Sequence, residues 1–421
     1  MRRTWWVVIL VMVLGVAGYL GAQAYASHIF EQELGRTIEA LRDDGQWEVE
    51  RKNVEQGWFQ SQGHLQLSPT GDDRWQAEIP YNASHGILST RLNGAVQILL
   101  SEDGDTSSTH MVFGDVLPSA EPRWTATFHT LDRQADGRLD VAGFELSRDE
   151  AQLSFSGAEF TAEGRLGDVA VQGQIAPIRW QQGREQLAIG PVHLNSRYQS
   201  SDDYYFHQRN ELILNRLDYQ GPQRAPVTLT GVHYSDETRL DDQLRLDMSL
   251  SLEQAQVAGE PLLAGRVDAS LDRLDGQAAR QLARQVETMI EEEGGDLSGL
   301  DEGGRRRLLQ RLEPTILSML ENSPRFILEG ATLSSSLFGV DTRGHGELVF
   351  DGQNVRTLSV LDLLDTDASA WRERLDGRFT WNGIPPLVAL QLGLPLDTRE
   401  LVITIDAGQI RINGRPLPSL M

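Results

Sequence analysis

Few residues of this sequence stand where a known reaction would need them. The nine histidines are dispersed, and no two lie two or four positions apart, the spacings at which a strand or helix brings two metal ligands to one face. A zinc site built from distant strands stays open as an alternative to ordinary surface histidines, which we favour. The chain has no cysteine, so disulfides, thiolate nucleophiles and cysteine-bound metals are excluded. We predict no metal ligands and no cofactor.

The motifs of common catalytic sites are also absent. The sequence contains no Gly-x-Ser-x-Gly elbow, no His-Glu-x-x-His helix, no Walker loop and no Gly-x-Gly-x-x-Gly fingerprint. Its 61 Asp and Glu residues make chance pairs of carboxylates inevitable, so hydrolysis of an envelope polymer is the least favoured alternative. We predict that the protein is not an enzyme and has no catalytic residues.

Two polar segments invite a functional interpretation. The acidic turn Glu102-Asp103-Gly104-Asp105 resembles part of a calcium loop, but it lacks the later bidentate Glu, so a solvated hairpin turn is favoured. Tyr204-Tyr205-Phe206-His207 suggests an aromatic platform. Adjacent strand residues point to opposite faces, however, so core and interface packing is expected there.

The net charge of the chain limits the classes of partner that it can bind. The formal net charge is −23, which opposes nucleic-acid backbones and anionic membrane surfaces. Hydrophobic residues make up 40% of the chain, enough for a packed core. We therefore predict a folded acidic protein that does not bind nucleic acid.

The N-terminal segment has the length of a membrane span. Residues 5–26 carry no charge, and a helix of that length covers roughly 33 Å. Arg2 and Arg3 precede it, so the positive-inside rule predicts a cytoplasmic stub (1–4), a transmembrane signal-anchor (5–26) and a periplasmic remainder on the bacterial inner membrane. The aromatic residues suited to the two membrane interfaces are Trp5, Trp6, Tyr19 and Tyr25.

A cleaved signal peptide is the alternative, because Ala22-Gln23-Ala24 and Ala24-Tyr25-Ala26 match the small-x-small pattern. Retention is favoured because an apolar stripe at helical spacing continues beyond the span. This stripe predicts a membrane-proximal helix over residues 27–44, and its members are Phe30, Leu34, Ile38 and Leu41.

Most of the remaining chain has the period of two that is typical of strands. From Leu244 to Leu252, apolar side chains alternate with polar ones, and Asx-Gly pairs such as Asp136-Gly137, Asp376-Gly377 and Asn413-Gly414 recur as expected hairpin turns. We predict a mainly β (α+β) protein, with one long antiparallel β-sheet domain over residues 45–273 and 324–421.

Residues 274–323 differ from the strands around them. Apolar residues at helical spacing predict a helical hairpin inserted into the sheet, ended in its first half by Gly294-Gly295 and kinked or split in its second half at Pro314. A further short helix is expected from Pro386 to Leu392, because proline suits a first helical turn.

The segment VEQGWFQSQGH at residues 54–64 places two aromatic rings behind a glycine, where the first helix has ended. Gly57 permits a bend, and we expect one of Trp58 and Phe59 to lie in the core and the other to face outward.

Five motifs in order resemble the YdgA-like family of bacterial inner-membrane proteins, a domain of unknown function. They begin with the apolar N-terminus and the Gly-Trp-Phe-Gln-Ser stretch, continue through Ser-His-Gly and Phe-Ser-Gly-Ala-Glu-Phe, and end with a Gly-Gln-Ile-Arg-Ile-Asn-Gly strand. Gln56 and Ile87-Leu88 depart from the family pattern. The residues that match, all expected to be structural, are Gly57, Trp58, Phe59, Ser61, His85, Gly86, Phe155, Gly157, Phe160, Gly408, Asn413 and Gly414.

The resemblance implies an exported domain held on the inner membrane, self-association into dimers and a role in the cell envelope, and it supplies no catalytic residues. We predict a non-catalytic protein that binds an envelope protein partner or acts as a scaffold. The alternative is lipid handling, by analogy with AsmA-like proteins. An open apolar sheet face would favour lipid handling, whereas a sheet that packs on itself would oppose it.

Overall fold

The computed structural model describes residues 2–43, 47–70, 75–101, 109–148, 150–201, 205–292, 302–336, 339–363 and 368–416. Side chains are described from residue 22 onward, except at positions 43, 287, 290–292 and 302. The acidic turn at 102–105, the pair Gly294-Gly295 and Tyr204 lie outside these residues.

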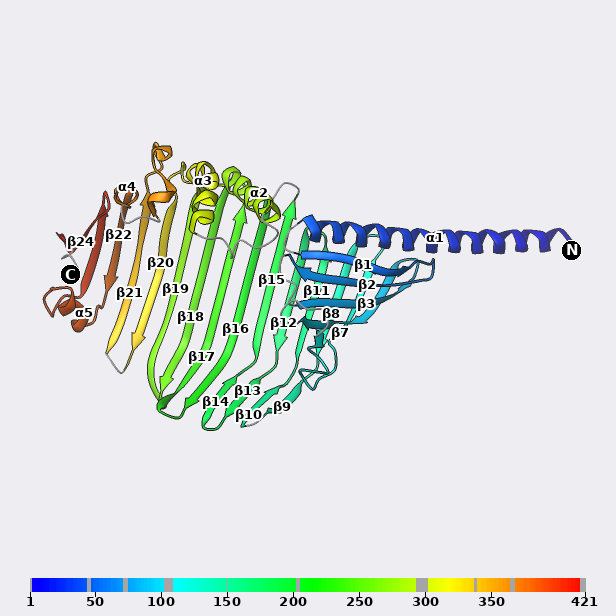
Figure 1. Ribbon diagram of the computed structural model, residues 1–421, viewed down its shortest axis with the longest axis horizontal. Helices are drawn as coiled ribbons and strands as arrows, with labels where there is room; N and C mark the ends of the chain where they lie inside the picture. The colour runs from blue at the N-terminus through cyan, green and yellow to red at the C-terminus, as the bar shows by residue number, and fades with distance from the viewer. Residues whose placement is uncertain are drawn as a thin grey trace. The chain divides into compact units, whose positions relative to one another are not determined.

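The chain folds into two compact units. Unit 1 comprises residues 1–146, 155–175 and 290–297, and unit 2 comprises residues 147–154, 176–289 and 298–421. Strands dominate both units, and neighbouring strands such as β11 with β12 and β16 with β17 are antiparallel (Figure 1). The predicted mainly β, antiparallel architecture is therefore confirmed.

Unit 1 combines one long helix with a meander of strands. In the sheet, β1 pairs with β2, β2 with β3, β3 with β4 and β5, β5 with β6, β4 with β7, β7 with β8, β8 with β11 and β11 with β12. The elements are α1 (Arg2–Asp43), β1 (Trp47–Glu55), β2 (Gln60–Pro69), β3 (Trp75–His85), β4 (Ser89–Ala95), β5 (Gln97–Ser101), β6 (Thr109–Met111), β7 (Arg123–His129), β8 (Gln134–Val141), β11 (Ala158–Arg165) and β12 (Asp168–Ile175). Two further strands, β9 (Phe144–Arg148) and β10 (Ala151–Phe155), are divided between the units.

The second half of α1 packs on this sheet. Ile29 and Phe30 of the helix form a buried cluster with Tyr81, Ala83 and Phe128 of the strands. The rings of Phe30 and Phe128 meet edge to face at 6.0 Å, an arrangement that aromatic pairs prefer. The predicted helical stripe is thus the side of α1 that faces the sheet, although Leu41 at its end is exposed.

The predicted membrane anchor is not what the structure shows. Over the residues that it describes, no helix is long and apolar enough to cross a bilayer, so the predicted single-pass inner-membrane localisation is contradicted. The described end of the predicted span faces protein instead, since Gln23 and Ala26 are fully buried in unit 1 and only Tyr25 is exposed. Trp5, Trp6 and Tyr19 lie outside the described side chains.

Unit 2 contains the longest strands. Consecutive strands from β16 to β25 pair with their neighbours in chain order, β14 pairs with the second half of β16, and β15 pairs with its first half. The strands are β13 (Ile178–Gln182), β14 (Glu185–Ile189), β15 (Val192–Ser201), β16 (Tyr205–Gly221), β17 (Arg224–Leu240), β18 (Gln243–Val257), β19 (Glu260–Asp275), β20 (Arg325–Ser335), β21 (Val340–Phe350), β22 (Leu375–Asn382), β23 (Glu400–Asp406), β24 (Gln409–Ile412) and β25 (Arg415–Pro416).

Helices interrupt this meander at the strand ends. The chain passes through α2 (Gly276–Glu292) and α3 (Glu302–Met319) between β19 and β20, within the residues for which the helical spacing predicts an insertion. Pro314 lies inside α3, which continues past it, so of the two predicted outcomes the split is wrong and the kink stays a prediction. The expected helix at Pro386 is present as α5 (Pro386–Gln391). The other short helices are η2 (Val355–Thr357), η3 (Val360–Leu363) and α4 (Ser369–Arg372).

The Asx-Gly pairs divide into turns and strand interiors. Asn413 and Gly414 have φ of 46° and 77°, so both occupy the left-handed region that a two-residue hairpin turn requires. Asp136-Gly137 and Asp376-Gly377 instead lie inside β8 and β22, which corrects their prediction as turns. At Gly377 a Cβ would lie 2.6 Å from the Glu347 carbonyl oxygen, so this glycine allows a close approach of backbones.

We predict that Phe30→Ala destabilises unit 1 by roughly 3 to 5 kcal/mol, because it empties the centre of the buried cluster under α1. Urea unfolding followed by circular dichroism, together with hydrogen exchange of β3 and β4, measures this loss. Phe59→Ala is the matched control, since Phe59 is exposed. Equal stability losses in the two variants would contradict the packing role of Phe30.

Candidate functional site

A buried polar network joins two of the family-motif residues in unit 1. Ser61 Oγ lies 2.9 Å from His85 Nε2, and His85 Nδ1 lies 3.0 Å from Thr90 Oγ1. Gln23 of α1 donates to the backbone carbonyl of His85. The network therefore ties the helix to β2, β3 and β4 through side chains that also satisfy one another.

A serine beside a histidine is an arrangement that can activate a nucleophile. Here Ser61 is 4% exposed and His85 is 7% exposed, and a threonine hydroxyl takes the position where an acidic group would orient the imidazole. Burial lowers the pKa of His85, which keeps the ring neutral, while the nearby Glu31 carboxylate opposes that shift. The geometry fits a structural hydrogen-bond network.

The other family-motif residues occupy turns and strand pairs. In unit 1, Gly86 donates its N–H to the Ser89 carbonyl at 2.8 Å, and the Phe155 ring lies 5.4 Å from Phe144. Gly157 has a φ of 112°, which glycine adopts without strain, and Phe160 pairs with Leu139 and Gly173.

The terminal motif belongs to unit 2. Gly408 has a φ of 74°, and its N–H donates to the Leu375 carbonyl at 2.9 Å. The Asn413 side chain accepts from the Val402 N–H at 2.7 Å and donates to the Glu400 carbonyl at 3.1 Å, which anchors the last hairpin. These contacts fit a structural role for the terminal motif.

Both rings of the Trp-Phe pair face outward. Trp58 is 60% exposed and Phe59 is 49% exposed, so the expectation that one ring lies in the core is wrong. The turn is held through its backbone by residues distant in sequence: the Ser27 hydroxyl donates to the Gly57 carbonyl, and the His85 N–H donates to the Phe59 carbonyl. Both rings are left outside. Two adjacent turns carry more exposed apolar side chains. Backbone hydrogen bonds join the turns: the His85 N–H donates to the Phe59 carbonyl at 2.8 Å, and the Thr130 N–H donates to the Leu88 carbonyl at 2.9 Å. We call this set the turn cluster; it comprises Trp58, Phe59, Ile87, Leu88 and Leu131.

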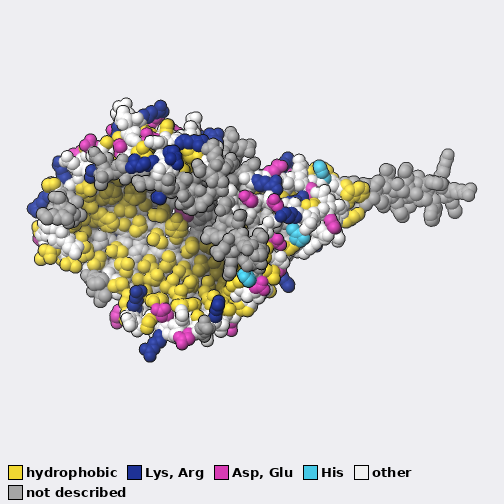
Figure 2. All heavy atoms as spheres, viewed as in Figure 1, with side chains coloured by type: hydrophobic (Ala, Val, Ile, Leu, Met, Phe, Trp, Pro, Cys, Tyr) yellow, Lys and Arg dark blue, Asp and Glu magenta, His cyan; other side chains and the backbone are white. Residues whose placement is uncertain are grey.

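An extended apolar surface lies on unit 2. Figure 2 shows a hollowed face over its long strands in which hydrophobic side chains predominate, with charged side chains at the rim. Alternate residues of each strand supply it: Leu246, Met248 and Leu250 of β18 pair with residues of β17 and β19 on this same face. We call it the apolar face. Its exposed large side chains are Tyr198, Leu246, Met248, Leu250, Val267, Phe326, Leu333 and Ile410.

The opposite face of the same strands carries paired charges. Arg209, His207 and Arg239 surround Glu237 and lower the pKa of that carboxyl to about 2, mainly through the hydrogen bonds from Arg209. Arg245 pairs with Asp247 at 2.8 Å along β18. The two faces of unit 2 therefore differ sharply in polarity, and the charged one is suited to water.

A band of polar side chains interrupts the apolar face. Ser196 Oγ donates to Asn210 Oδ1 at 2.8 Å, and Asn210 Nδ2 donates to Asp236 Oδ2 at 3.0 Å. Gln208 also donates to Asn210, at 3.3 Å. We call this set the polar band; its members on β15, β16 and β17 are Ser196, Gln208, Asn210, Tyr234, Asp236 and Thr238, all at positions of the apolar face.

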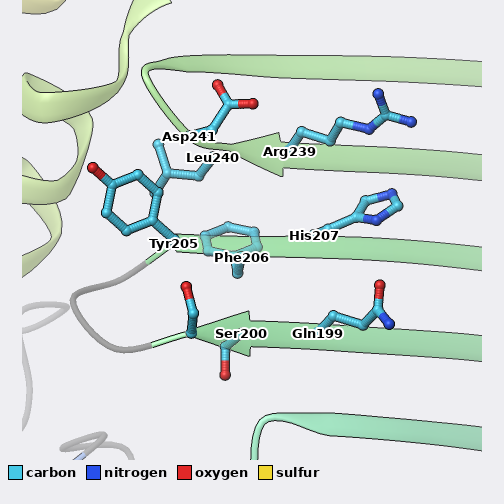
Figure 3. A pocket seen from close by; sticks show the side chains of 9 residues that line it. Gln199, Ser200, Tyr205, Phe206, His207, Arg239, Leu240 and Asp241 are labelled. Carbon is cyan, nitrogen blue, oxygen red and sulfur yellow. The ribbon is translucent and has the colours of Figure 1, made fainter.

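A pocket of about 350 Å³ opens where β15, β16 and β17 end. Figure 3 shows His207 and Arg239, which lie opposite each other on β16 and β17, and Tyr205 and Asp241 at the strand ends. Phe206 stacks on Tyr198 at 6.1 Å, and Arg280 of α2 lies 4.1 Å from the Tyr205 ring centroid. Tyr205 and Phe206 thus contact different groups, as the alternation of adjacent strand residues predicts. The pocket borders the apolar face at Phe206 and Leu240.

Sequence reasoning did not find the polar band. Within the described ranges, no group of three or more histidine and acidic side chains is placed to hold a metal ion. The sequence signal that indicates the band is a break in the alternation of each strand. Asn210 and Asp236 lie at positions where the alternation of β16 and β17 predicts apolar residues. To see that these residues share one face across neighbouring strands, the strand register is needed, and the sequence alone does not provide it.

The fold and its surfaces define an antiparallel β-sheet protein with a large open apolar face. The chain belongs to the family described as bacterial protein of unknown function (DUF945), whose model matches residues 1–364, and the YdgA-like resemblance is thereby confirmed. Gly408, Asn413 and Gly414 lie beyond the matched residues. No curated protein and no solved structure shows a significant similarity to the chain.

We predict that acidification destabilises the native protein partly through His85. Its pKa is lowered in the folded state, so the unfolded chain binds the proton more readily. The stability contributed by the neutral ring is present above the ordinary pKa of about 6.5 and is lost as the pH falls through it. His85→Gln should therefore lose less unfolding free energy than the wild type between about pH 7.5 and about pH 5.

Urea titrations at each pH measure this difference. His64→Gln removes an exposed imidazole and is the control. A wild-type pH dependence that persists in His85→Gln would contradict the assignment.

Proposed function

We propose that the protein binds a lipid along the apolar face of unit 2. The observation that carries the proposal is the exposure of large apolar side chains that share one face of the neighbouring strands β18, β19 and β20, among them Leu250 at 46%. Soluble proteins rarely leave contiguous apolar surface of this kind without a ligand or partner. Of the functions predicted from the sequence, lipid handling by analogy with AsmA-like proteins is the one that requires such a face.

The dimensions of the face suit an acyl chain. The interstrand spacings from β16 to β23 number seven, and at ~4.8 Å each they span roughly 34 Å. One leaflet of a bilayer core is about 15 Å thick, which is the extent of its acyl chains. A lipid chain can therefore lie across these strands within the face, replacing water over apolar side chains.

The described helices leave this face open. The buried side chains Leu317 of α3 and Val355 and Val360 of the 3-10 helices form a separate core cluster. Arg280 of α2 donates to the Asp241 carbonyl in the turn after β17. These contacts place the helices at strand ends, and their role in the proposal is to border the apolar face.

We predict that Leu250→Asp weakens binding of a neutral fluorescent diacylglycerol by at least about tenfold, because it puts a charge under the bound chain. Ser251→Asp is the matched control, since it adds the same charge at the adjacent position on the opposite face. Fluorescence titration of the purified full-length protein measures both affinities. Mass spectrometry of lipid extracted from the protein gives an independent readout.

Equal binding by Leu250→Asp and the wild type would overturn the proposed location. A protein that carries no extracted lipid and binds no diacylglycerol would overturn the function itself. Thermal unfolding of both variants checks that they remain folded.

A second candidate function is self-association through the turn cluster of unit 1. Aromatic side chains are enriched in protein interfaces, and Trp58 and Phe59 present two exposed rings beside Leu88. The family resemblance implies dimers, so the partner that we propose for this surface is a second copy of the chain. The polar backbone contacts within the cluster fix its shape before any partner binds.

We predict that Trp58→Asp converts a dimer to a monomer, because a charge replaces the largest apolar side chain of the proposed contact. Light scattering coupled to size-exclusion chromatography measures the mass. Gln62→Asp, at an exposed position of β2, is the control. A wild-type protein that is monomeric at high concentration would contradict this candidate, and so would a dimer unaffected by Trp58→Asp.

A further inference from the structure

The polar band contains a carboxylate whose surroundings differ from those of the other strand acids. Along β17 to β19, Glu237, Asp247 and Asp268 each pair with an arginine on the charged face. Asp236 instead lies on the apolar face. Within the described part of the chain it has no cationic partner, and its carboxylate accepts from the Asn210 amide at 3.0 Å.

Neighbouring groups hold this carboxylate in place. Tyr234 is two residues away on the same face, and burial together with the Asp236 charge raises the pKa of the Tyr234 phenol. The tyrosine is therefore neutral at physiological pH. Ser196 and Gln208 both donate to Asn210 Oδ1, which fixes the amide so that its NH₂ group faces Asp236.

Apolar side chains enclose the band along the strands. Leu212 and Leu250 flank Tyr234 on one side, and Phe206 and Leu244 flank Leu240 on the other, at paired positions of β16, β17 and β18. Met248 is directly opposite Asp236 on β18 and is exposed. A half-buried charge thus lies within a surface that otherwise attracts apolar groups, and leaving such a charge without a counter-charge is unfavourable.

We infer that the polar band binds the ammonium group of a single- or double-chain amphiphile whose apolar part lies along the apolar face. This inference rests on the proposed lipid-binding function and specifies the polar end of the ligand. An ammonium has three donors and no acceptor, so it complements the free lone pairs of the Asp236 carboxylate and the hydroxyl oxygens of Ser196 and Thr238. The net charge of −23 also favours a cationic head over an anionic one.

Three probes that each contain twelve carbon atoms test this inference: dodecylamine, 1-dodecanol and dodecanoate. Each displaces the neutral fluorescent diacylglycerol from the full-length protein near neutral pH, where the amine is protonated. The wild type should bind dodecylamine at least about tenfold more tightly than 1-dodecanol, because hydrogen bonds to a charged group are stronger than neutral ones. Dodecanoate should bind most weakly.

Asp236→Asn should abolish the preference for the amine and leave the affinity for 1-dodecanol unchanged. Asp247→Asn is the matched control, since it removes the same charge from the opposite face of the adjacent strand and should keep the preference. Asp236→Ser is a second variant, to be used if thermal unfolding shows that Asp236→Asn does not fold.

A wild-type protein that binds the amine and the alcohol equally would overturn the inference and leave lipid binding intact. A preference lost equally in Asp236→Asn and Asp247→Asn would assign it to net charge and would also overturn the inference. If the diacylglycerol binds but none of the three probes displaces it, the inference fails and lipid binding stands. If the diacylglycerol itself does not bind, the proposed function fails as well.

Discussion

Alternation of side chains across the strands is the constraint on which this structure depends. Because successive residues of a strand point to opposite faces, a strand that alternates apolar and polar residues gives its sheet one face that avoids water. In unit 1, α1 covers part of such a face, and Phe30 lies in the centre of the contact with Tyr81 and Phe128. In unit 2, the corresponding face carries exposed side chains such as Leu250 and Met248. The same rule thus produces a core in one unit and a candidate binding surface in the other.

The charged residues follow from the same constraint. Arginines on the polar face of unit 2 stand next to acids two residues away or across a strand, as in Arg245 with Asp247 and Arg209 with Glu237. Exposed pairs of this kind contribute little to stability individually, so their main effect is to keep the face hydrated and the strand register defined. Asp236 differs because its position in the alternation places it among apolar side chains, where a hydrogen bond from Asn210 replaces a salt bridge.

The sequence predicts the elements of this fold better than their surfaces. Alternation from Leu244 to Leu252 is sufficient to identify β18, and proline at a first helical turn is sufficient for α5, because both signals are local. The pairs Asp136-Gly137 and Asp376-Gly377 misled the turn prediction, since glycine also serves close backbone contacts inside strands. The apolar N-terminal run predicted a membrane span, whereas Gln23 and Ala26 at its end are buried against protein. Neither the exposure of both Trp58 and Phe59 nor the polar band could be predicted, because each depends on contacts between residues distant in sequence.

The order of the strands in unit 2 has a consequence for how the chain acquires its structure. From β16 to β19, each strand pairs with the strand that precedes it and the strand that follows it, across short connections such as the Ala258-Gly259 turn, where both residues have positive φ. Most of these contacts are therefore local in sequence. Short loops lower the entropic cost of bringing two strands together, which favours fast folding of the sheet. The sheet can grow by one hairpin at a time, each new strand using the last as its template. In such an array, a destabilising substitution in one strand affects mainly its two neighbouring strands. During folding, the last strand formed has an unpaired edge, which can pair with a wrong strand until the next strand is added.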